Sequence, residues 1–178
     1  AETQAEVEHL LISRSGVYHE AAAEDQTMID TRPARGSHAP DAFFYHNNWD
    51  VNALGAIFEQ ETGEEICDAF KKEISDVVGM ADFSIDDCFY RYEWDKSLHP
   101  AYHFKMSARD MARFGVLYQM NGAWEGKQII PVDWIIESTI AYSTVDASTG
   151  VGYGYMWYVV PEASDTAELL GYDCYYHT

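Results

Sequence analysis

Basic residues are scarce in this chain of 178 residues. Its 11 lysines and arginines stand against 30 aspartates and glutamates, which gives a formal net charge of -19 at pH 7. A surface of this sign repels phosphate backbones and anionic lipids, so the composition argues against nucleic-acid binding. The acidic residues form several separate clusters, a distribution typical of a solvated face rather than of one cation site. The clusters lie at residues 2–8, 59–65, 82–87 and 162–168.

Long apolar runs are absent as well. Those present are far shorter than the roughly 20 residues that a helix needs to cross a bilayer, so we predict no membrane span. The chain is nevertheless 47% hydrophobic and 15% aromatic, which is enough for a globular core. Since no repeat, low-complexity tract or long linker divides it, we expect residues 1–178 to belong to a single domain.

Cysteine and histidine patterns that would indicate metal binding are missing. The three cysteines, at positions 67, 88 and 174, are far apart and form no Cys-x-x-Cys pair. Their spacing implies neither a disulfide framework nor a zinc site. Cys67 falls in an amphipathic pattern, where core packing is the expected role and a reactive thiol the alternative. His19-Glu20 fails the His-Glu-x-x-His pattern, because Ala23 occupies the second ligand position. We predict no metal and no cofactor.

Hydrophobic periodicity predicts helices first and strands last. A short helix ending near Arg14 precedes a long irregular loop over residues 17–42, and further helices are expected at 50–61, 64–74, 107–120 and 132–138, with a turn-and-strand unit at 123–130. Ser107 and Asp110 form a capping-box-like pair. From Gly150 the pattern alternates, which predicts one strand to about residue 160, a polar loop at 161–166 and a second strand over 168–178. Helices followed by an antiparallel strand pair define an α+β fold.

The segment from Phe43 to Gly55 is the most informative one. It places polar aromatic and amide groups directly before a helix whose Leu54, Ile57 and Phe58 repeat at helical spacing. A junction of this kind can serve a site, because the loop is adaptable while the helix is fixed. The alternative is purely structural, a helix cap surrounded by buried aromatic side chains.

A family resemblance rests on this segment and on others in the same order. Tyr45-x-Asn47 before Leu54-Gly55 resembles the second signature of the serine β-lactamase and penicillin-binding-protein superfamily, in its class C-like and esterase branch. Residues 9–17 are similar to the family's HLL-x-x-x-SG segment, and Thr62-Gly63 with 78–80 to its TG…PLGM stretch. Residues 106–115, 130–134 and 152–157 are similar to further family segments. The resemblance implies a partial β-lactamase/transpeptidase-like fold.

The nucleophile of that family is missing from the sequence. It belongs to a Ser-x-x-Lys motif, and no serine here has a lysine three residues later. In the family this motif lies upstream of the segment matched by residues 9–17, while a third motif, Lys- or His-x-Gly, lies near His177. We therefore expect an internal fragment, truncated at both ends and inactive by itself.

The resemblance assigns roles to individual residues. Tyr45 would be the base that activates the serine, and Asn47 would hold the substrate and the lysine. Counting back from Leu54-Gly55 with the family's commonest spacing reaches His46 instead, which gives the triplet His46-Asn47-Asn48. An unperturbed tyrosine, with a pKa near 10, is a poor base at neutral pH, whereas imidazole titrates close to it. Trp49 and His177 are the expected substrate contacts.

Two classes of function follow from the resemblance. The first is a serine hydrolase that cleaves an ester or amide, including peptides, through an acyl-serine intermediate. The second is a non-catalytic relative that binds peptidoglycan-like peptides or acyl compounds, with Trp49, Tyr155 and Trp157 as contacts. Loop shape separates β-lactams, D-amino-acid peptides and simple esters within the superfamily, so the choice among these substrates stays open, as does the oligomeric state. The resemblance implies a periplasmic or secreted location.

Overall fold

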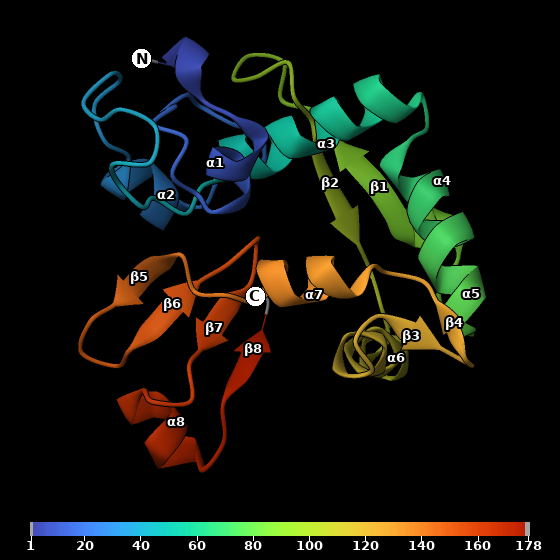
Figure 1. Cartoon of the computed structure of the whole chain (residues 1–178). Coiled ribbons are helices and arrows are strands. Elements are labelled where there is room, and N and C mark those ends of the chain that lie inside the picture. The colour runs from blue at the N-terminus through green and yellow to red at the C-terminus, as the bar shows by residue number, and fades with distance from the viewer. Residues whose placement is uncertain (1, 177–178) are drawn as a thin grey trace. The chain divides into compact units, whose positions relative to one another are not determined.

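The computed structural model describes residues 2–176, which fold into helices and antiparallel strands (Figure 1). The α+β class expected from the sequence is therefore confirmed. The described chain divides into two compact units. Unit 1 holds residues 2–19, 25–50 and 136–176, and unit 2 holds residues 20–24 and 51–135. None of the described helices is long and apolar enough to cross a membrane.

Unit 1 contains short helices and a four-stranded antiparallel sheet of order β5-β6-β7-β8. Its helical elements are a 3-10 turn (Glu2–Gln4), α1 (Val7–Leu11), α2 (Gln26–Thr31), the first turn of α3 (Asn48–Thr62) and α8 (Asp165–Leu170). Its strands are β5 (Ser143–Asp146), β6 (Val151–Tyr153), β7 (Tyr158–Val160) and β8 (Cys174–Tyr176). The last strands therefore form a larger sheet than the pair expected.

The single strand expected over residues 150–160 is wrong, because β6 and β7 form a hairpin. Gly154 N–H donates to the Trp157 carbonyl (2.8 Å), and Met156 adopts a positive φ of 62° in the turn. Gly154 is required there, since a Cβ at this position would lie 2.4 Å from the Ser138 carbonyl oxygen. The apolar alternation continues through the turn, so periodicity alone could not reveal it.

Two helices lie where loop or strand was expected. Within the predicted loop 17–42, Asp25 caps α2 by accepting the Met28 N–H (2.8 Å). Within residues 161–178, Ser164 caps α8 by accepting the Ala167 N–H (3.1 Å), and Gly171 ends that helix at a φ of 81°. Both caps are short polar side chains of the usual kind, but the helices they start are too short to show a helical period.

Unit 2 packs helices against a two-stranded hairpin. Its elements are the rest of α3, α4 (Ile66–Phe70), a π-helical turn (Lys71–Ser75), α5 (Asp76–Val78), a 3-10 turn (Ile85–Asp87), β1 (Cys88–Arg91), β2 (Ala101–Phe104), α6 (Ala108–Gln119), β3 (Ala123–Trp124), β4 (Lys127–Gln128) and most of α7 (Val132–Ser138). The helix expected over 64–74 is thus present as α4 and the π-helical turn, and α5 continues it beyond the expected range. The core gathers Val78, Met80, Phe83 and Leu117 with Cys67 and Cys88.

The start of α6 confirms one half of the capping prediction. The Ser107 hydroxyl accepts the Asp110 N–H (3.2 Å), as an N-cap should. The Asp110 carboxylate does not return to the cap. It is fully buried and accepts the N–H groups of Ala81 and Asp82 instead, at 3.1 Å each. The predicted return bond from Asp110 to the cap is therefore wrong, because the Asp110 carboxylate accepts backbone N–H groups of a neighbouring loop instead.

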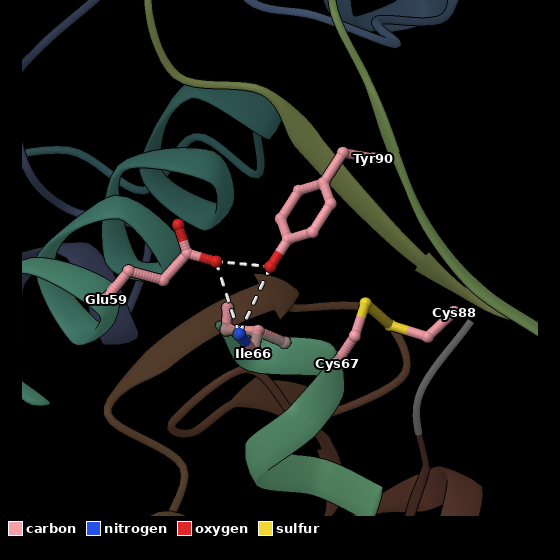
Figure 2. The surroundings of a disulfide bond; sticks show 5 residues. All are labelled: Glu59, Ile66, Cys67, Cys88 and Tyr90. Carbon is pink, nitrogen blue, oxygen red and sulfur yellow. Dashed lines mark hydrogen bonds between the residues drawn. A yellow bond between two sulfur atoms is a disulfide. The ribbon is translucent and has the colours of Figure 1, made fainter. Parts of the chain in front are cut away.

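The cysteine spacing implied no disulfide framework, but Cys67 at the start of α4 is bonded to Cys88 at the start of β1 (Figure 2). Both side chains are buried, so Cys67 does pack in the core as expected. Cys174 is half-buried and free. Spacing rules did not find the bond because its partners are 21 residues apart on two different kinds of element.

Candidate active site

Burial alternates along the junction that precedes α3. Tyr45 is only 7% exposed and Asn47 only 3%, whereas His46 and Asn48 are half-buried. Residues 43–47 belong to no helix or strand. The register that uses Tyr45 and Asn47 therefore presents buried side chains. The register that uses His46 and Asn48 presents side chains that are partly exposed to solvent.

Asn47 is the N-cap of α3. Its side-chain oxygen accepts the Asp50 N–H (2.9 Å), and its amide nitrogen donates to the Tyr45 carbonyl (2.6 Å) and to the Asp50 carboxyl (3.1 Å). Both ends of the amide are thus bonded within the chain, which is the structural alternative that the sequence left open.

The phenol of Tyr45 is also bonded within unit 1. Its O–H donates to the Met28 carbonyl (2.6 Å), and its ring packs edge-on against Tyr18 with ring centroids 5.8 Å apart. The backbone N–H of Tyr45 donates to the Ser13 carbonyl (2.9 Å). To take a proton from a nucleophile, this oxygen would first have to release the Met28 carbonyl.

His46 lies beside the aromatic face of the unit 1 sheet. Its Nδ1 is 3.3 Å from the Tyr158 hydroxyl, and its ring is 5.6 Å from the ring of Tyr153 and 5.7 Å from that of Tyr158. The tyrosine rings restrict the imidazole, and the Tyr158 hydroxyl can fix one of its tautomers. Restriction and partial exposure together are what a general base requires.

Asp50, in the first turn of α3, is completely buried. Burial raises the pKa of its carboxyl to about 7, against the opposing effect of hydrogen bonds from Ser15 and Asn47. Burial, followed by the charge of Asp50, raises the pKa of the neighbouring Tyr18. The carboxyl that holds the Asn47 amide therefore changes its charge near neutral pH.

The other predicted contacts are dispersed. Trp49 is half-buried and stacks on His19, with ring centroids 5.5 Å apart. Tyr155 donates its O–H to the Glu8 carboxylate (3.1 Å), and Trp157 packs edge-on against Tyr175 at 5.3 Å. His177 lies outside the described residues. The part of the chain that the structure describes contains no group of three or more His, Cys, Asp or Glu side chains that could hold a metal ion.

Sequence reasoning missed Asp50 and Tyr158 as neighbours of the site. Asp50 follows Asn47 by three residues, the spacing of an N-cap and its N3 partner, so a capping pattern could have drawn attention to it. Tyr158 faces His46 only because β6 and β7 form a hairpin, which the alternating pattern concealed.

Comparison with known proteins shows the family to which the chain belongs. The Beta-lactamase family model matches residues 1–178, so the chain belongs to the Beta-lactamase family. The resemblance expected from its ordered segments is thereby confirmed. None of the curated proteins matches the chain.

Solved structures share the fold at low identity. A protein from Bacillus anthracis assigned as a 6-aminohexanoate-dimer hydrolase is 18% identical, with a TM-score of 0.64 over 87% of this chain and 47% of its own. An octameric penicillin-binding protein homologue from Pyrococcus abyssi is 21% identical, with a TM-score of 0.60 over 86% of this chain and 43% of its own. A D-stereospecific amidohydrolase from Streptomyces sp. is 16% identical, with a TM-score of 0.58, 88% of this chain covered and 57% of its own. The chain thus spans about half the length of these structures.

Proposed function

We propose that these residues are the middle portion of a serine hydrolase that cleaves an ester or amide through an acyl-serine intermediate. The match of the Beta-lactamase family model along residues 1–178 carries the proposal. The names of the Streptomyces amidohydrolase and the Bacillus hydrolase support a hydrolytic reaction at an amide or a related acyl group. The nucleophile is proposed to lie outside this chain, because none of its serines belongs to a Ser-x-x-Lys motif.

In the proposed reaction the serine oxygen bonds to the acyl carbon while a base accepts the serine proton. The alcohol or amine then leaves with that proton, and water releases the acyl group with the same base assisting. The base remains Tyr45 or, in the other register, His46. The half-buried imidazole beside Tyr158 favours His46, because the Tyr45 phenol is bonded to Met28.

The choice of register also changes the substrate-binding residue. With Tyr45 as the base, Asn47 would bind substrate, but its amide already caps α3. With His46 as the base, the half-buried Asn48 takes that place and Asn47 is left to support it. Trp49 and His177 remain the proposed contacts at the edge of the site.

A non-catalytic binding relative is the second candidate. The lack of Ser-x-x-Lys within residues 1–178 favours it, and Trp49, Tyr155 and Trp157 would then supply apolar contacts to a peptide or an acyl compound. The two candidates differ in whether the protein ever forms a covalent bond to its ligand.

The test is labelling by a fluorescent fluorophosphonate, applied to this chain and to the full reading frame that encodes it. We expect label on the full protein and none on residues 1–178. Label on this chain would place the nucleophile inside it, and an unlabelled full protein would leave only the binding relative. In the labelled protein, His46→Gln is expected to slow labelling about a hundredfold or more and Tyr45→Phe much less. The reverse order would restore Tyr45 as the base.

A further inference from the structure

Unit 2 contains an apolar groove of about 380 Å³ that the proposed hydrolase site does not use. Leu54 and Phe58 of α3, Ile66 and Ala69 of α4, and Tyr102 and Phe104 of β2 line it. The volume lies in the range of small-molecule sites, which are mostly apolar with a few polar groups.

The wall made by β2 is fixed in place. The Tyr102 hydroxyl donates to the Val51 carbonyl of α3 (3.2 Å), and its ring lies directly against Gly55. A Cβ at Gly55 would come within 2.5 Å of that ring, so the absence of a side chain is what allows the ring this position. The ring is therefore held before any ligand arrives.

The wall made by α4 is braced at its first residue (Figure 2). The Ile66 N–H donates to the Tyr90 hydroxyl (3.1 Å) and to the Glu59 carboxylate (3.2 Å), while the Tyr90 O–H donates to the same carboxylate. The next residue, Cys67, is bonded covalently to Cys88 of β1. A groove with two braced walls needs little ordering on binding, which lowers the entropic cost.

The groove has a negatively charged edge. Glu73, in the π-helical turn, carries the single formal charge among the described residues that line it. Its partner is the Lys72 ammonium (2.9 Å), which Glu64 also contacts (3.0 Å). Two carboxylates thus share one ammonium, and an excess negative charge remains at the edge of an otherwise apolar surface.

We propose that this groove binds a small apolar molecule that carries an amine. Its hydrocarbon part would fill the space between α3 and α4, and its ammonium group would lie at Glu73. The net charge of -19 adds to the attraction for a cation and opposes an anionic ligand of the same shape. This binding is independent of the proposed hydrolase chemistry.

Three probes of equal length test the proposal on the 178-residue chain: 4-phenylbutylamine, 4-phenylbutanol and 4-phenylbutyrate. Calorimetry at low salt is expected to show the amine binding about tenfold more tightly than the carboxylate, with the alcohol between them. Methyl NMR signals of Leu54, Ile66 and Ala69 should shift on addition of the amine.

Glu73→Gln should weaken amine binding about threefold to fivefold and leave the alcohol unchanged. Glu61→Gln, which removes the same charge from an exposed position of α3 outside the groove, is the matched control and should change neither. Equal affinity for amine and carboxylate, an equal effect of both variants, shifts confined to other methyl groups, or no binding by any probe would overturn the proposal. Protection of these methyl groups by a dimer would assign the groove to a second copy and overturn it as well.

Discussion

Two helix starts are held in different ways, α3 in unit 1 and α4 in unit 2. At α3 the Asn47 side chain accepts the Asp50 N–H and donates to the buried Asp50 carboxyl and to the Tyr45 carbonyl, and all of these are hydrogen bonds. At α4 the Ile66 N–H has two acceptors, and a disulfide follows at the next residue. The start of α4 is thus fixed by hydrogen bonds and by a covalent bond, whereas the start of α3 is held by hydrogen bonds, one of which involves a titrating carboxyl. The predictions below test this contrast from the largest expected effect to the smallest.

The largest effect is expected from the protonation of Asp50. Because burial raises its pKa from 3.8 to about 7, the folded chain holds this proton more tightly than the unfolded chain does. Below about pH 4 both states are protonated, and above pH 7 both are ionised. Between these limits the Asp50 contribution to stability falls as the pH rises, by about 4 kcal/mol for a shift of this size.

Asp50→Asn isolates this contribution, because the amide keeps the shape and an acceptor for Asn47 but cannot ionise. Urea unfolding of both proteins at pH 5 and pH 8 should show the variant gaining stability relative to wild type at the higher pH. The surface variant Asp86→Asn serves as the control for the general loss of one negative charge. An unchanged difference between Asp50→Asn and wild type at the two pH values would show that Asp50 is ionised throughout.

The disulfide is expected to have the next largest effect. Replacing Cys67 and Cys88 together with alanine should lower the free energy of unfolding by about 3 kcal/mol, because a loop of this length is no longer closed in the unfolded chain. Urea unfolding with and without a reductant measures it. The double variant should be insensitive to the reductant, and Cys174→Ser should behave like wild type. Equal stability of the oxidised and reduced wild-type protein would contradict a stabilising role.

Asn47 comes third. Asn47→Ala removes the N-cap of α3 and leaves the Tyr45 carbonyl and the Asp50 carboxyl without this donor, so we expect a loss of about 2 kcal/mol. Asn48→Ala, one residue further and half-buried, should cost about 0.5 kcal/mol or less. Urea unfolding at pH 7 compares the two variants. If Asn48→Ala were the more damaging, the cap would not be the main stabilising role at this junction.

The site could be located from the sequence but its register could not. The position of residues 43–47 before a helix drew attention to the junction, the family resemblance assigned roles to Tyr45 and Asn47, and the family's commonest spacing pointed to His46 instead. Which side chain faces inward depends on long-range partners, such as the Met28 carbonyl for Tyr45 and the Tyr158 hydroxyl for His46. These partners are 17 and 112 residues away in the sequence, and no local pattern contains them.

For the fold, long amphipathic segments with caps were predictable and short elements were not. α3 and α6 lie close to the expected ranges, because each is several turns long and repeats apolar residues at helical spacing. The Ser107 cap of α6 was also expected. α2 and α8 have six residues each, which is too few for a period to be recognised. The Cys67–Cys88 bond depends on how α4 and β1 pack, and the sequence carries no separate signal for it.

The smallest effect is expected at the redundant helix start. Tyr90→Phe removes the hydroxyl group that donates to Glu59 and accepts from Ile66. The Ile66 N–H keeps the Glu59 carboxylate as its acceptor. The disulfide at Cys67 also remains, so the loss should be about 1 kcal/mol in urea unfolding. In the Cys67→Ala/Cys88→Ala background the same substitution should cost more, because α4 then has only this network at its start. If the cost were the same in both backgrounds, the two braces would act independently, and the contrast with α3 would rest on the covalent bond alone.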